Sequence, residues 1–228
     1  MKIQKISDIK VTGLSVLLFA CPKTGKTTAI ASLPGKTLII DCDKGTDTIR
    51  NIVRDDIDII QFDNETNLLT ILDFLETQSH DYKNIVIDSL SEAENIILSE
   101  LGKKGKNQGI PELQHYQVCD YRIQDIVRRF RNLTSTGLNC IFTCWEEAAD
   151  VVSSTGEKRS VIKPKIRKAE SICGLMSIIG RLEISIKDGV TRYFRFQSVD
   201  NMYCGDRIFK RQFCKVNELL GEVKADEK

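Results

Sequence analysis

The chemistry best supported by residue type and spacing is phosphate binding, in the stretch ACPKTGKT at positions 20–27. The P-loop pattern is G-x-x-x-x-G-K-[ST] between a strand and a helix. Here only its first glycine differs, because Ala20 stands there. Backbone N–H groups in such a loop surround phosphates at a helix N-terminus, where partial positive charge favours anions.

Lys26 would neutralise the β and γ phosphates of ATP, and the Thr27 hydroxyl would ligate Mg²⁺. Ala20 fits if it keeps a negative φ; the alternative is a chance GKT in a turn. The expected nucleotide contacts are Cys21, Pro22, Lys23, Thr24, Gly25, Lys26, Thr27 and Thr28.

Two further acidic positions follow apolar, strand-like runs. Asp88 ends the run IVID and would face the water shell of Mg²⁺ at the edge of a sheet. Asp43 follows the run TLIID and would accept a proton from the attacking water, with Asp41 as the alternate. The alternative for Asp88 is a helix cap, and for Asp43 it is a solvated turn.

These residues need a scaffold of alternating strands and helices, which predicts an α/β fold with a mostly parallel sheet. We expect an antiparallel hairpin near the C-terminus, over 178–187 and 191–196, joined by a turn at 187–189. We expect 102–111 to be an exposed loop, and 146–163 to be a loop or hairpin with a turn at 153–156. The expected strands are 14–20, 36–41, 57–62, 84–88 and 138–145, and the expected helices are 65–77, 89–101, 112–135 and 166–176.

Length and composition fit one domain, over 1–222, followed by a charged tail at 223–228. The net charge of +1 predicts no nucleic-acid partner by itself, so any basic surface must be local. No stretch approaches the ~18 apolar residues of a membrane span, and we expect no membrane partner. The eight cysteines lack a CxxC pair and are read as reduced thiols of a cytosolic protein, not as a zinc site. The N-terminal apolar run resembles a lipoprotein signal, but the phosphate-binding pattern after it is far more specific.

Together these motifs resemble the RecA-like P-loop ATPases, and more narrowly the short phage-encoded nucleotide-binding proteins of that superfamily. The resemblance rests on ACPKTGKT, on IIDCDKG and on IVIDS, and it extends over positions 5–210. Softer motifs in the same order are LQHY at 113–116, FTCWE at 142–146, KPK at 163–165 and IGRL at 179–182. The resemblance implies an ATP-dependent single-strand annealing or recombination protein with a RecA-like fold.

The resemblance also implies residue roles that the spacing alone does not. Glu146, after the fifth strand, would be a polar sensor that couples the γ-phosphate to a DNA-binding loop. Arg207, or Lys210, would reach a neighbouring subunit's phosphates in a homo-oligomeric ring or filament, although Gly205 replaces the lysine of that motif. The acid after the second strand is normally Glu, so Asp43 is one methylene shorter. Single-stranded DNA would contact Lys103, Lys104 and Lys106 in one loop and Lys158 and Arg159 in another, with Lys163 and Lys165 in or beside it.

The function predicted is an ATP- and Mg²⁺-dependent, DNA-stimulated ATPase that promotes annealing or strand pairing in phage recombination, in the host cytoplasm. The first alternative is a nucleotide-binding switch or scaffold with negligible hydrolysis, acting on a replication or packaging partner. A small-molecule kinase is a weaker alternative, because the 102–111 loop has no arginine. We also expect positive charge in the phosphate loop to lower the pKa of Cys21, so that oxidation would block nucleotide. Trp145 is expected to pack at the end of its strand.

Overall fold

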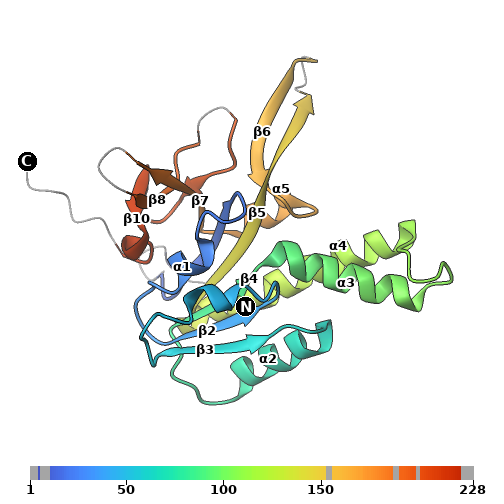
Figure 1. Cartoon of the computed structure of the whole chain (residues 1–228), viewed down its shortest axis with the longest axis horizontal. Helices are drawn as coiled ribbons and strands as arrows, with labels where there is room; N and C mark the ends of the chain where they lie inside the picture. The colour runs from blue at the N-terminus through green and yellow to red at the C-terminus, as the bar shows by residue number, and fades with distance from the viewer. Residues whose placement is uncertain (1–4, 6–10, 153–155, 187–189, 199–200, 222–228) are drawn as a thin grey trace, which may run out of the picture.

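The chain forms the α/β fold that the sequence predicts, with a central, mostly parallel sheet flanked by helices and antiparallel C-terminal strands (Figure 1). The structure is a computed structural model that describes residue 5 and residues 11–152, 156–186, 190–198 and 201–221. The expected C-terminal tail at 223–228 lies outside these residues.

The strands are β1 (Ser15–Ala20), β2 (Thr37–Asp41), β3 (Ile57–Gln61), β4 (Asn84–Asp88), β5 (Asn139–Val152), β6 (Lys158–Pro164), β7 (Ile178–Ser185), β8 (Thr191–Arg195), β9 (Gly205–Asp206) and β10 (Phe213–Lys215). The helices are α1 (Lys26–Ile30), α2 (Glu65–Thr77), α3 (Leu90–Lys104), α4 (Leu113–Asn132) and α5 (Ala169–Leu175).

The strand order places the carboxyl ends of the parallel strands side by side. The order is β10-β8-β7-β1-β5-β4-β2-β3, with β6 paired to β5 and β9 to β7. The pairs from β7 through β1, β5, β4 and β2 to β3 are parallel. Strands β6, β8, β9 and β10 join antiparallel. Residues that follow β1, β2 and β4 therefore meet at one end of the sheet, beside Trp145 of β5, which is level with Ala20.

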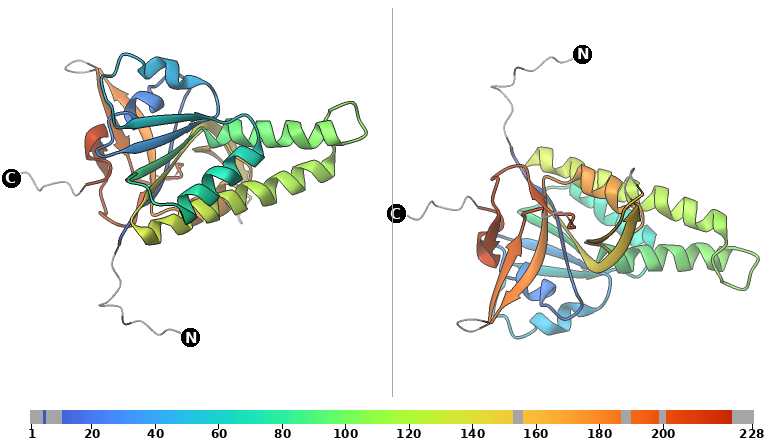
Figure 2. Two further views of the ribbon diagram at one scale, coloured as in Figure 1. Left: turned by 90° about the horizontal axis from the view of Figure 1, so that it is seen from below. Right: turned by 90° about the horizontal axis from the view of Figure 1, so that it is seen from above.

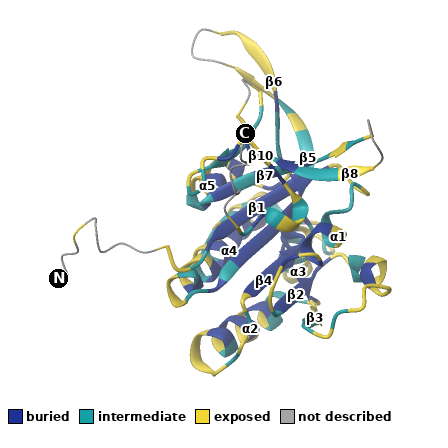
Figure 3. Ribbon diagram, turned by 90° about the vertical axis from the view of Figure 1, so that its left-hand side faces the viewer, coloured by how far each residue is buried: buried dark blue, intermediate teal, exposed yellow. Residues whose placement is uncertain are grey.

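Each face of the sheet has its own hydrophobic core, because side chains alternate along a buried strand. Leu17 and Phe19 of β1 pack with helices α2, α3, α4 and α5. Val16 and Leu18 point to the other face and pack with α1 and the C-terminal segment. Figure 2 shows α2, α3 and α4 together on one side, and Figure 3 shows the buried strands between the two layers.

Several elements agree closely with the sequence prediction. Strand β4 and helix α2 have the bounds expected for 84–88 and 65–77. Helix α3 begins after Ser89, whose side chain accepts a hydrogen bond from the Glu92 backbone N–H at 3.4 Å. A Ser cap of this kind satisfies one of the free N–H groups of the first turn.

Four element boundaries differ from the prediction by three residues or more. Helix α4 ends at Asn132 instead of at 135, because the chain tightens into a 3₁₀ helix at Leu133–Thr136. Helix α3 continues to Lys104, where an exposed loop was expected from position 102. Gly102 is buried in the last turns of the helix, and a Cβ there would lie 2.5 Å from the Gly109 carbonyl oxygen, so the chain that returns toward α4 packs closely against this part of α3. Strand β5 runs on to Val152 because β6 pairs with it, and α5 begins at Ala169 instead of at 166. Of the loop or hairpin expected for 146–163, the structure has the hairpin, formed by β5 and β6. Residues 153–155 of its expected turn lie outside the described residues, as does the turn expected at 187–189.

Two other features are absent from the described ranges. None of the helices there is both long and apolar enough to cross a membrane. The same ranges hold no group of three or more His, Cys, Asp or Glu side chains placed to bind a metal ion.

Candidate nucleotide-binding site

The residues after β1 curl into a loop that leads directly into α1. Ala20 is the last residue of β1 and has no positive φ, so its methyl group is tolerated where the pattern has glycine. Gly25 does need its freedom, because it has φ 96° at the start of α1. The Lys26 Nζ donates to the Ala20 and Cys21 carbonyls at 3.1 and 3.3 Å, so the ammonium lies inside the curve of the loop. Burial lowers the pKa of Lys26, while nearby acids, Asp88 first, oppose that shift.

A carboxylate lies between two hydroxyl groups beside this loop. Thr27 Oγ1 donates to Asp88 Oδ2 at 2.8 Å, and Thr143 Oγ1 of β5 donates to Asp88 Oδ1. Asp88 is buried, which raises its pKa, while the two threonine hydrogen bonds oppose the shift. A hydroxyl and a carboxylate are hard oxygen donors, as Mg²⁺ prefers, so Thr27 and Asp88 fit the ion expected there.

Two aspartates after β2 have different surroundings. Asp41 is fully buried and accepts hydrogen bonds from the Gly45 and Thr46 backbone N–H groups, the Thr46 hydroxyl and the Gln61 amide. Asp43 is exposed as a residue and accepts one hydrogen bond, from Gly45 N at 3.1 Å. Partial loss of hydration, with the Asp88 and Asp41 carboxylates nearby, raises the pKa of Asp43 to about 6.

The position of Gly45 shows that Asp43 faces the phosphate loop. A Cβ built on Gly45 would lie 2.7 Å from Asp43 Oδ1 and 3.6 Å from Thr27 Oγ1. The Asp43 carboxylate and the Thr27 hydroxyl are therefore neighbours across one small residue. Of the two acids, Asp43 is the one with spare acceptor capacity toward the loop.

Glu146 reaches the other side of the phosphate loop. Its carboxylate binds Arg181 of β7 through both oxygens, at 2.8 and 3.0 Å, and accepts from Cys21 Sγ at 3.4 Å. The lowered pKa expected for Cys21 is wrong: partial loss of hydration, together with the hydrogen bond and charge of Glu146, raises the pKa of this exposed thiol. Because the Cys21 thiol donates a hydrogen bond to the Glu146 carboxylate, the positive charge of the loop does not determine the protonation state of this thiol.

A second arginine contacts the loop from β8. Arg192 Nε donates to the Thr24 carbonyl at 3.0 Å, and a Cβ on Gly25 would lie 2.8 Å from the same nitrogen. Any side chain at position 25 would therefore displace Arg192. The C-terminal hairpin thus supports the phosphate loop directly.

The remaining predicted site residues lie away from the loop. Arg207 N donates to Ser177 O, and Ser177 N donates to Ser15 O at the start of β1, so Arg207 is at the opposite edge of the sheet. Lys210 follows it and is also exposed. Neither contacts the phosphate loop of its own chain, so any contact with phosphates would have to be made in trans. Lys103 and Lys104 end α3, Lys106 follows, and Lys158 and Arg159 begin β6, all of them exposed.

Sequence reasoning missed Thr143, Arg181 and Arg192 as site residues. Thr143 carries a local clue, because it is a polar residue within the buried run of β5. Arg181 and Arg192 carry none, since each lies more than 150 positions after the loop and meets it only through the sheet order.

Comparison with known proteins agrees with this geometry. The sequence model of a family described as AAA domain matches residues 12–208, which include every strand from β1 to β9. A search of curated proteins found no match. Given a phosphate loop after β1, a hydroxyl–carboxylate pair beside it and a match over most of the chain, the protein belongs to the AAA domain family of nucleotide-binding, ATPase-type proteins.

Proposed function

We propose that this protein is an ATP- and Mg²⁺-dependent ATPase, stimulated by single-stranded DNA, that promotes annealing or strand pairing in phage recombination. The observation that carries the nucleotide chemistry is the contact between Thr27 and Asp88 at 2.8 Å, beside the loop that holds Lys26. It joins the two motifs that the sequence separates by 61 positions.

The residues of the loop divide the work as follows. Backbone N–H groups of 23–28 and the Lys26 ammonium bind the phosphates. Thr27 and Asp88 hold Mg²⁺, which supplies charge neutralisation to the phosphoryl oxygens. Asp43 orients the attacking water and accepts its proton. Glu146 binds Arg181 beside the phosphate loop and acts as the polar sensor: its side chain shifts when the γ-phosphate is bound or released.

Two protruding elements support the single-stranded DNA partner. The β5–β6 hairpin and the α3–α4 pair both project from the sheet (Figure 1). Lys158 and Arg159 lie in the first, and Lys103, Lys104 and Lys106 at the tip of the second. Exposed basic residues on projecting elements suit a phosphate backbone without sequence preference.

A homo-oligomer in the host cytoplasm is part of the proposal, because Arg207 would act on a neighbour's nucleotide. A second candidate is a nucleotide-binding switch with negligible turnover.

The contacts of two arginines favour this switch. Within the described part of the chain, Arg181 and Arg192 lie beside the phosphate loop, but Arg181 binds Glu146 and Arg192 binds the Thr24 carbonyl. Without a neighbouring subunit, neither arginine is free to stabilise the transferred phosphate.

The test is phosphate release with ATP and Mg²⁺, with and without single-stranded oligonucleotide, beside Lys26→Ala. We expect DNA-dependent turnover that the variant loses. Tight ATP binding without turnover in either condition would favour the switch, and turnover unchanged in Lys26→Ala would reject both candidates.

A further inference from the structure

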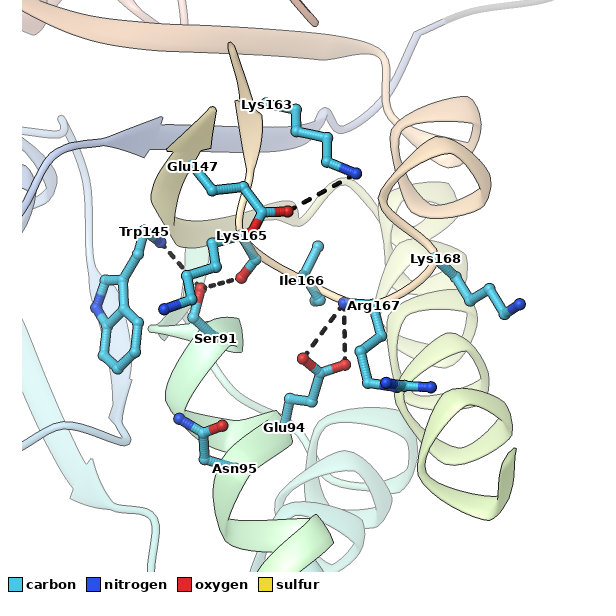
Figure 4. Close-up of a pocket in the computed structure, with 10 residues that line it drawn as sticks. All are labelled: Ser91, Glu94, Asn95, Trp145, Glu147, Lys163, Lys165, Ile166, Arg167 and Lys168. Carbon is cyan, nitrogen blue, oxygen red and sulfur yellow. Dashed lines mark hydrogen bonds and ion pairs between the residues drawn. The ribbon is translucent and has the colours of Figure 1, made fainter. Parts of the chain in front are cut away.

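A second pocket lies on the helical side of the sheet edge, apart from the phosphate loop. Its volume is about 350 Å³, within the size range of small-ligand sites. It lies at the root of the β5–β6 hairpin, between the start of α3 and the segment that leads into α5 (Figure 4). The residues that line it are Ser91, Glu94, Asn95, Trp145, Glu147, Lys163, Lys165, Ile166, Arg167 and Lys168.

Three residues of the pocket hold one another in a closed ring of hydrogen bonds. Trp145 N donates to Ser91 Oγ at 2.9 Å, and Ser91 Oγ donates to the Lys165 carbonyl at 2.7 Å. Lys165 N in turn donates to the Trp145 carbonyl at 2.8 Å. The backbones that carry the indole ring and the lysine are therefore fixed to the start of α3, as a preorganised site requires.

The charges of the pocket leave one cation free of ion pairs. Lys163 lies 3.7 Å from Glu147, and both Arg167 and Lys168 contact Asp120. Lys165 has no carboxylate partner among the described residues, and its Nζ lies 5.5 Å from the centre of the Trp145 ring. Glu94 is directed at the Arg167 backbone N–H, at 3.1 and 3.3 Å, and away from the indole. A half-buried aromatic ring and an unpaired ammonium thus face the same space.

We propose that this pocket binds one nucleotide unit of a single strand, with the base stacked on Trp145 and the phosphate at Lys165. The proposal rests on the DNA partner of the proposed function and names where the strand is held. Bases stack on aromatic side chains whatever their sequence, and an adjacent ammonium supplies the backbone contact. The incoming base replaces the Lys165 ammonium on the ring, and the phosphate gives that ammonium an anionic partner.

The pocket is joined to the nucleotide site through two short paths. Trp145 is followed by Glu146, which binds Arg181 and Cys21 beside the phosphate loop. Asp88 ends β4, and Ser91 lies three positions later in the first turn of α3, which follows that strand directly. A DNA strand that shifts Trp145 on binding would therefore move groups on both sides of the bound phosphates. This contact is how DNA binding would stimulate ATP hydrolysis.

Trp145 is the only tryptophan of the chain, so its fluorescence reports on this pocket alone. We expect saturable quenching by an oligothymidylate at low salt. Binding of a fluorescein-labelled oligothymidylate, followed by anisotropy, should weaken roughly 5- to 140-fold in Trp145→Ala, the range typical of a lost stacked base. Trp145→Phe should recover most of that loss. Lys165→Ala should weaken binding and reduce the slope of log affinity against log salt by about 0.7.

Lys36→Ala is the matched control, because Lys36 Nζ also lies over an aromatic ring, 5.1 Å from the centre of Tyr82, outside this pocket. It should bind as the parent does. If the parent binds the oligonucleotide but neither quenching nor weakening in Trp145→Ala occurs, the pocket is not the site and the proposed function stands. If the parent binds no oligonucleotide, the DNA partner itself is wrong. If thymidine monophosphate quenches as strongly at the same concentration, the pocket takes free nucleotides and the strand proposal is overturned.

Discussion

At the scale of single residues, burial separates two aspartates that the sequence leaves as alternates. Asp41 has its acceptor sites filled by Gly45, Thr46 and Gln61, and it shapes the turn after β2. Asp43 has one hydrogen bond and faces the phosphate loop. The geometry therefore favours a structural role for Asp41 and a catalytic role for Asp43.

Substitution of each aspartate by asparagine should separate these roles. We expect Asp43→Asn to bind ATP normally and to lose turnover by about 10²- to 10⁴-fold, the usual contribution of a general base. Asp41→Asn should lower the free energy of unfolding by about 1–3 kcal/mol, because its amide group would face backbone donors. Phosphate release, ATP binding and urea unfolding measure the two effects. Full turnover in Asp43→Asn would exclude it as the base.

Glu94 makes stability depend on pH. Burial raises its pKa from 4.5 to about 7, opposed by the Arg167 N–H and charge and supported by the Asp120 and Glu147 carboxylates. The folded state thus binds the proton more tightly than the unfolded state does. Stability is therefore greatest below about pH 4.5 for this group and falls as pH rises toward 7, by up to about 3 kcal/mol.

Glu94→Gln should remove that dependence. The variant keeps a carbonyl acceptor for the Arg167 N–H, and we expect its free energy of unfolding to exceed the parent's by about 1–3 kcal/mol at pH 8. Urea unfolding at pH 5, 6, 7 and 8 measures the slope. Glu100→Gln, on the same helix, is the control, and a slope unchanged in Glu94→Gln would contradict the prediction.

At the scale of elements, one arginine holds the segment after β8 against the sheet. Arg211 is nearly fully buried, binds Asp206 at 2.6 Å and donates to the carbonyls of Glu218, Leu219 and Gly221. Its guanidinium also lies over the Phe196 and Phe209 rings. β9, the Phe196 ring after β8 and the final turn are therefore joined through a single side chain.

Arg211→Met should destabilise the chain by about 3–5 kcal/mol, since it leaves the buried Asp206 carboxylate without its ion-pair partner and with only the Ile208 and Phe209 N–H groups as donors. Chemical unfolding measures the loss, and Lys210→Ala, at the exposed neighbouring position, should change it little. A loss below about 1 kcal/mol in Arg211→Met would show that solvent reaches Asp206.

At the scale of the whole molecule, nucleotide binding should stabilise the fold, because the loop, β4 and the β2 turn meet only in the folded state. At 100 times the dissociation constant of Mg²⁺ and ATP we expect about 2.7 kcal/mol, and a Tm rise of roughly 5–10 °C. Thermal melts measure the shift. Lys26→Ala should show none, and an equal shift in that variant would place the nucleotide elsewhere.

The sequence predicts the sheet strands and the phosphate loop well, since buried runs such as IVID and the GKT spacing are local signals. It predicts less where distant segments decide the outcome. The continuation of β5 depends on pairing with β6, and the last turns of α3 lie against Gly109 of the chain that returns toward α4. Arg181 and Arg192 reach the loop only because β7 lies beside β1 and β8 beside β7.

The distribution of the thiols has a practical consequence. Of the eight cysteines, Cys21 alone is exposed, and it lies in the phosphate loop beside Glu146. Alkylation by a bulky maleimide should therefore modify one position first, and faster as pH rises, because the pKa of that thiol is raised. The untreated chain thus carries its own footprinting probe, whose rate of modification reports occupancy of the loop without any engineered label.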